Sequence, residues 1–187
     1  MKDETRGEVG DAAERGVSRS RKKKGISVGQ GLLYGALAGL AATVPMTAVM
    51  GLLHRALPEH ERYPLPPREI TMEIAEEVGV KEQLDEPGRV GVTLAAHFGY
   101  GAAIGALYAP LARRSPLAPA LSGAAYGLAV WAGSYLGWLP AMGILRPATQ
   151  HPPRRNALMI TAHLVWGVAA GVMLDELQER EEKTDAA

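Results

Sequence analysis

The segment AHFGYGAAIG at residues 96–105 recurs as AHLVWGVAAG at residues 162–171, and both copies lie within long uncharged stretches. The copies share an Ala-His start, an aromatic residue followed by glycine in the middle, and an Ala-x-Gly end. Burying an imidazole in apolar surroundings costs free energy unless the ring is hydrogen-bonded. The repetition of His97 and His163 in the same setting therefore predicts a membrane protein built from two similar halves.

Charged residues are confined to the tails and loops, although 21% of the whole chain is charged. All 20 carboxylates lie in residues 3–14, 59–86 or 175–185. A spanning helix needs roughly 20 apolar residues, and four stretches have about that length. A soluble domain of 187 residues has too little amphipathic material to bury four such segments. We therefore expect an all-α, polytopic membrane protein with transmembrane helices at residues 29–53, 90–112, 117–145 and 157–174. The third of these is long enough to tilt or to bend at Pro140.

The basic residues set the expected orientation of the chain. A dense cluster, Arg19–Lys24, directly precedes the first span, and cytoplasmic segments are enriched in lysine and arginine. With four spans, both termini then lie in the cytoplasm. We expect a disordered basic tail over residues 1–28, a membrane domain over 29–174 and a polar cytoplasmic tail over 175–187.

The loop between the first two spans is expected to carry one amphipathic surface helix over residues 66–80. Its two leading prolines suit the first turn of a helix, where no backbone donor is lost. Apolar residues then recur every four positions among glutamates, at Ile70, Ile74 and Val78. That pattern is typical of a helix with one apolar face.

Further likeness between the halves predicts two parallel two-helix repeats. Gly31-x-x-Tyr34-Gly35 corresponds to Gly123-x-x-Tyr126-Gly127, and Pro-Pro-Arg occurs at both 66–68 and 152–154. Because each half contributes two spans, the repeats should be related by an axis along the membrane normal. Small residues at four-residue spacing let membrane helices approach closely. The glycines expected at such helix contacts are Gly35, Gly39, Gly101, Gly105, Gly127, Gly167 and Gly171.

Three motifs carry a resemblance to a known family. They are Pro64-Leu65-Pro66-Pro67-Arg68, Pro140-Ala141-Met142-Gly143 and His163-Leu164-Val165-Trp166. Together they resemble the YagU-like family of small, uncharacterised bacterial inner-membrane proteins, and the similarity covers most of residues 30–175. The resemblance implies a location in the bacterial inner (plasma) membrane and supplies no catalytic residue. The loop after these prolines is shorter here and lacks cysteine, so the family's loop chemistry is not carried over.

His97 and His163 are the candidate functional pair, because ionisable groups in spans usually face the bundle interior. Three roles stay open at this stage. Each ring can form a structural hydrogen bond between helices, or the pair can sense protons, since an imidazole titrates near pKa ~6.5. The two rings can also ligate a haem or a metal ion. We expect no cofactor and no metal.

The arginines of the two Pro-Pro-Arg turns are a second set of candidates. Arg68, Arg154 and Arg155 have the chemistry to hold an anion such as a lipid phosphate. The alternative, which we favour, is that the prolines shape the loops while the arginines anchor them at the lipid head groups.

The expected function is non-enzymatic. No carboxylate lies between residues 87 and 174, and the chain has no cysteine, so the groups left in the spans for acid–base or covalent catalysis are histidine, tyrosine, serine and threonine. We expect a component that responds to membrane stress or external pH through the two histidines. The alternatives are a small oligomeric transporter or channel and, third, a bis-His haem protein. The expected partners are the lipid bilayer and further copies of the chain, with no nucleic acid.

Overall fold

The computed structural model describes residues 26–186, so the predicted disordered tail lies almost entirely outside the described residues. Every regular element in this part of the chain is helical, which confirms the all-α prediction. In chain order the elements are α1 (Val28–Arg55), η1 (Glu59–Glu61), α2 (Pro66–Glu77), η2 (Lys81–Gln83), α3 (Glu86–Ala112), α4 (Pro119–Ala132), the π-helix η3 (Gly133–Trp138), α5 (Leu139–Ala141), η4 (Ala148–Gln150) and α6 (Pro153–Ala186).

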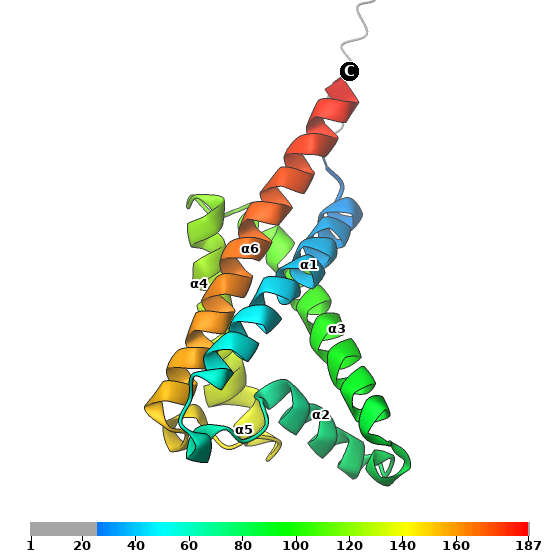
Figure 1. The fold of residues 1–187 in the computed structure, drawn as a ribbon. Helices are drawn as coiled ribbons and strands as arrows, with labels where there is room; N and C mark the ends of the chain where they lie inside the picture. The colour runs from blue at the N-terminus through cyan, green and yellow to red at the C-terminus, as the bar shows by residue number, and fades with distance from the viewer. Residues whose placement is uncertain (1–25, 187) are drawn as a thin grey trace, which may run out of the picture.

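The long helices are arranged around α1 and α6. Helix α1 packs against both α3 and α6, and α6 packs in turn against α4. Contacts of α3 with α4 and with α6 are sparse. Figure 1 shows α3 diverging from the other helices toward the end of the molecule where α2 lies. Helix α2 lies across that end, between α3 and the α5 region (Figure 1).

Among residues 26–186, three helices are long and apolar enough to cross a membrane, namely α1, α3 and α6. In the most apolar stretch of α3, only 11% of the residues are buried inside the protein. Large apolar side chains on this helix, including Leu94, Leu107 and Leu111, are exposed instead. Such a continuous apolar surface is unusual for a protein in water and is what contact with lipid requires.

The predicted third span, residues 117–145, differs most from expectation. It consists of α4, the π-helix η3 and the short helix α5, so it is not one continuous α-helix. Gly137 has non-helical φ and ψ angles of −113° and −108°. Pro140 explains the disruption, because it donates no hydrogen bond to the carbonyl four residues earlier and its ring crowds that carbonyl. The other three predicted spans correspond to α1, α3 and α6. Helices α1 and α3 are a few residues longer than predicted, and α6 extends well beyond the predicted end at residue 174.

The predicted glycines lie where helix backbones cross. A Cβ added at Gly39 would overlap the carbonyl oxygen of Gly101, and one at Gly105 would overlap that of Gly35. In the second pair of helices, a Cβ at Gly167 would overlap the carbonyl oxygen of Gly123. Two crossings, α1 with α3 and α4 with α6, therefore depend on glycine in the way that close membrane-helix packing does.

The two crossings nevertheless have different registers. Gly35 lies against the carbonyl of Gly105, whereas Gly127, its counterpart in the sequence repeat, lies against the carbonyl of His163. If the halves superposed on their sequence motifs, Gly35 would lie against His97. The helix contacts therefore do not confirm the predicted repeat.

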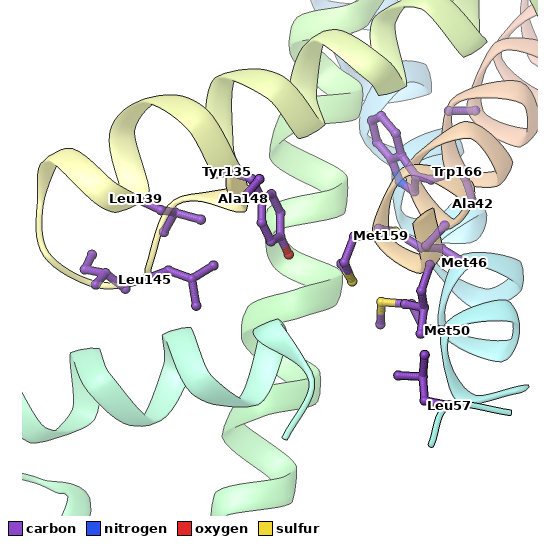
Figure 2. Close-up of a cluster of buried hydrophobic side chains, with 14 residues drawn as sticks. Ala42, Met46, Met50, Leu57, Tyr135, Leu139, Leu145, Ala148, Met159 and Trp166 are labelled. Carbon is purple, nitrogen blue, oxygen red and sulfur yellow. The ribbon is translucent and has the colours of Figure 1, made fainter. Parts of the chain in front are cut away.

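A buried apolar cluster joins α1, α6 and the η3–α5 region. Figure 2 shows Met46 and Met50 of α1 beside Met159 of α6, with Tyr135 and Leu139 approaching from the broken third segment. Methionine fills irregular spaces well because its side chain is unbranched and flexible. This cluster holds the disrupted segment against the two central helices.

The ends of the long helices are fixed by local hydrogen bonds. Ser27 and Gln30 form a capping box at the start of α1, and Asp85 caps α3 by accepting from the Gly88 amide. Helix α6 continues to Ala186, well past the predicted span, and the Gln30 amide nitrogen donates to Glu181 at 3.0 Å. Residues 175–186, predicted as a polar tail, therefore extend α6 as helix.

Candidate functional site

A cavity of about 260 Å³ lies between α1, α2, α3, η3 and α6. Its walls are mainly apolar, and His97 of α3 and His163 of α6 both line it. The structure thus brings the two predicted histidines to one cavity, although the helix pairs that carry them differ in register. Helix α2 contributes Ile70 and Ile74, so the amphipathic helix covers this cavity with its apolar face.

The π-helix supplies one wall of the cavity. Ser134, Tyr135 and Trp138 all lie within η3, and all three line the cavity. An extra residue in a helical turn rotates the following side chains relative to a regular α-helix, and such bulges are frequent at functional sites. The sequence signals for this wall are the glycines at 133 and 137 with Pro140 close behind, and we predicted only a bend there.

His163 is held in a defined orientation. The residue is 6% exposed, and its Nδ1 lies 2.8 Å from the carbonyl oxygen of Met159. Because a carbonyl only accepts hydrogen bonds, Nδ1 carries the proton, and Nε2 of the neutral ring then has a free lone pair. The edge of the imidazole also packs against the Tyr135 ring at 5.8 Å between centroids.

His97 is less fully enclosed, but one of its nitrogens is buried. Its Nε2 is shielded from solvent and has no hydrogen-bond partner among the described residues. The two imidazoles are near enough to interact electrostatically. An unpaired buried polar atom is costly, so this nitrogen is a candidate for contact with something other than the described protein groups.

The remaining polar groups of the cavity are mostly paired with each other or with the backbone. The hydroxyls of Tyr100 and Ser134 lie 3.2 Å apart. The Trp166 indole donates to the carbonyl of Gly39 at 3.1 Å, and the Thr43 hydroxyl donates to the same carbonyl at 2.8 Å. These contacts tie α3 to η3 and α1 to α6. These contacts could not be predicted, because nothing in the sequence indicates which helices are neighbours.

Among the described residues, no carboxylate lines the cavity. Glu69 of α2 acts electrostatically on Tyr135 and on Arg155. One oxygen of the Glu69 carboxylate is buried without a hydrogen-bond partner in the described chain. The sequence placed this glutamate among the polar residues of the predicted surface helix 66–80, and α2 brings it close to the apolar interior.

Arg155 ties the loop after α1 to the start of α6. The residue is 4% exposed, and its guanidinium donates to the carbonyls of Glu61, Tyr63 and Pro64 at 2.9–3.0 Å. Its Cζ atom also lies 3.4 Å above the centre of the Tyr63 ring, a cation–π arrangement. With three carbonyls and a ring already in contact, this arginine is a structural tie and is poorly placed to hold an anion.

The other two candidate arginines lie at the surface. Arg68 forms a two-pronged ion pair with Glu86 at the start of α3, at 2.7 and 2.8 Å. This hydrogen-bonded carboxylate raises the pKa of Arg68. Arg154 is exposed. Both Pro-Pro pairs lie at the start of a helix, α2 and α6, as proline's fixed φ angle favours.

A smaller hydrogen-bonded group lies in the loops beside Arg155. The Tyr63 hydroxyl is 2.9 Å from His151 Nδ1, and His151 Nε2 is 3.1 Å from the carbonyl of Arg146. Burial lowers the pKa of His151, and its backbone hydrogen bond opposes that effect in part. Within residues 26–186, no three His, Asp or Glu side chains gather as metal ligands.

The fold and the cavity define a class: helical proteins of the membrane with a mainly apolar interior site. Residues 58–172 match the family described as "Protein of unknown function (DUF1440)", which is more than half of the chain. The chain belongs to this family, the YagU-like family of uncharacterised membrane proteins, and the predicted resemblance is confirmed. Among curated proteins and solved structures, no match was found.

Proposed function

We propose that this protein is a four-span inner-membrane protein that responds to external acid through His97 and His163, without enzymatic activity. One observation carries the proposal: two imidazoles from different helices line a single apolar cavity that α2 covers. In this proposal α2 lies on the outer side of the membrane, and both termini lie in the cytoplasm. The wider role is a membrane-stress component that senses acid outside the cell.

The lengths of the segments support four spans. The segments α4, η3 and α5 contain 14, 6 and 3 residues, which at ~1.5 Å rise per residue reach roughly 35 Å. The hydrocarbon core of a bilayer is about 30 Å thick. An even number of spans then places the basic residues Arg113 and Arg114 on the side of both termini, in agreement with the positive-inside rule.

The acid response follows from the chemistry of the cavity. Besides the two histidines, its titratable residues are Tyr100 and Tyr135, and a phenol stays neutral in mild acid. Protonating either imidazole places a charge among apolar groups, and protonating both adds repulsion between like charges. Helix α2, which covers the cavity, should move away from it before the other helices do. It packs mainly on α3 and is held there by the exposed Arg68–Glu86 ion pair.

Spin labels can test this movement, because the natural chain has no cysteine and introduced ones are labelled uniquely. We suggest E73C on α2 and L52C on α1, both exposed positions, in lipid nanodiscs. The expected result is a longer or broader label separation at pH 5 than at pH 7.5. In the background H97Q/H163Q the separation should not change with pH. An unchanged separation in the parent protein, or the same change without the histidines, contradicts the proposal.

A small oligomeric transporter is the competing proposal, and the cavity is the observation that favours it. The site lies among the helices of one protomer and has room for a small solute. Liposomes containing the protein would then show a solute or proton flux that A96F, which fills the cavity, removes. The acid-response proposal expects the same low flux as in protein-free liposomes.

A further inference from the structure

We infer that the cavity is a binding site for a compact, uncharged, mainly apolar molecule that carries a hydroxyl group, the chemical class of a phenol. The inference concerns the same cavity as the proposed function. It does not depend on the acid response, so either can fail without the other.

The size and lining of the cavity define the apolar part of the ligand. An apolar cavity of about 150 Å³ in a protein interior binds benzene, and this cavity of about 260 Å³ is larger. The aromatic rings of Tyr135, Trp138 and Trp166 line it together with aliphatic side chains. Flat aromatic walls favour a ring over a long flexible chain, because rings stack in offset or edge-to-face contact.

The two histidines define the polar part. Nδ1 of His163 donates to a backbone carbonyl, so Nε2 of the neutral ring can only accept. The hydrogen bonds of His163 within residues 26–186 include none to that nitrogen, and the buried Nε2 of His97 has no partner there. A ligand that brings a hydrogen-bond donor can therefore pair with His163. A hydroxyl does so, and its oxygen can also accept a hydrogen bond, which suits a cavity that His97 lines as well.

Other polar groups fit the same site less well. A ketone or ether accepts hydrogen bonds and leaves the lone pair of His163 unpaired. A carboxylate has no donor either, and it adds the cost of a buried charge with no fixed cation lining the cavity. An ammonium group donates but carries the same burial cost. The neutral hydroxyl is the group that pairs with the site without adding charge.

The test compares two fluorinated probes of nearly equal size, 4-fluorophenol and fluorobenzene, by ¹⁹F NMR at pH 7.5 with the full-length protein in nanodiscs. Empty nanodiscs provide the correction for partitioning into lipid. One net hydrogen bond contributes about 0.5–1.5 kcal/mol, which is roughly a twofold to tenfold difference in affinity. We expect saturable binding of 4-fluorophenol and binding of fluorobenzene that is weaker by that factor.

Two neighbouring alanines of α3 offer a matched pair of variants. Ala96 lines the cavity and Ala95 does not, although both are exposed. We expect A96F to abolish binding of both probes and A95F to leave it unchanged. H163F should remove the preference for the phenol. Equal affinity of the two probes in the parent protein overturns the assignment of a hydroxyl ligand. Absence of saturable binding, or binding that survives A96F, overturns the site itself.

Discussion

The α1–α3 and α4–α6 helix pairs both pack closely through glycine, but the histidine of each pair lies at a different position relative to the crossing. Both pairs cross where glycines bring the backbones together. In the second pair the crossing includes the backbone of His163, and this histidine is buried. In the first pair the crossing lies at Gly101 and Gly105, so that His97, earlier in α3, lies outside it.

This difference shows what the sequence repeat encodes. Ala-His followed by spaced glycines specifies helices that pack closely, but it does not specify which turn of each helix meets the other. The shift in register turns two similar motifs into two unlike positions. One imidazole is locked to its own helix, and the other has a buried nitrogen without a partner. The cavity lies between them.

The largest expected effect comes from disrupting a crossing. A side chain at Gly39 would overlap the backbone of α3, whereas one at Gly51 of the same helix meets nothing within 4 Å. We expect G39L to destabilise the protein by about 3 kcal/mol, since overpacking typically costs 1–3 kcal/mol and backbone can yield little. Unfolding by SDS in mixed micelles measures this change. G51L is the matched control, and an equal loss in both variants would show that the α1–α3 crossing is not close.

The crossing of α4 and α6 should respond similarly if the two pairs are equivalent in packing. We expect G127L to destabilise the protein about as much as G39L, because the added side chain would overlap the backbone of His163. The same micelle titration compares the two variants. A loss confined to one of them would mean that only one pair depends on close glycine contact.

The next largest loss of stability is expected for Arg155, which joins the loop after α1 to the start of α6. R155M removes a buried guanidinium from three backbone carbonyls, and we expect a loss of about 2 kcal/mol because hydrogen bonds to charged groups contribute 1.5–3 kcal/mol. The control is R154M at the exposed neighbour, for which we expect less than about 0.5 kcal/mol. The same micelle titration applies. Equal effects of the two substitutions would contradict the role assigned to Arg155.

Substitution of His151 should have a smaller effect, which concerns how stability depends on pH. Its pKa is lowered in the folded protein, chiefly by burial, so folding favours the neutral ring. The stabilisation from this ring is therefore present above the ordinary histidine pKa of ~6.5 and is lost as the pH falls toward the lower folded value. Its surroundings include Tyr63, Arg146, Glu69 and Arg155. We expect H151Q to weaken the loss of thermal stability between pH 7 and 5, and an unchanged pH profile would contradict this.

The helix positions were predictable because charge marks them. Carboxylates and arginines bound the apolar stretches, and α1 and α3 begin and end within a few residues of the predicted bounds, whereas α6 continues as helix to Ala186. The break in the third segment was only partly predictable. Pro140 signalled a bend, but a π-helix depends on how η3 packs against α1 and α6, and no local pattern specifies that packing.

The registers of the crossings could not be predicted. Helix α1 has glycines at residues 31, 35 and 39, so a shift by one turn exchanges one glycine contact for another at little cost. The role of Arg155 was equally hidden, because two adjacent arginines point to different sides of a helix and the sequence does not show which side is buried. That the two histidines line one cavity follows from these tertiary choices.

The central claim is that His97 and His163 line one cavity beside the π-helix. The most direct measurement is solid-state NMR of histidine-labelled protein in bilayers, with His54, His60 and His151 replaced by glutamine so that only the two intramembrane rings report. We expect through-space correlations from both imidazoles to residues 134–138. Correlations from His97 to lipid acyl chains alone, with none to this segment, would contradict it.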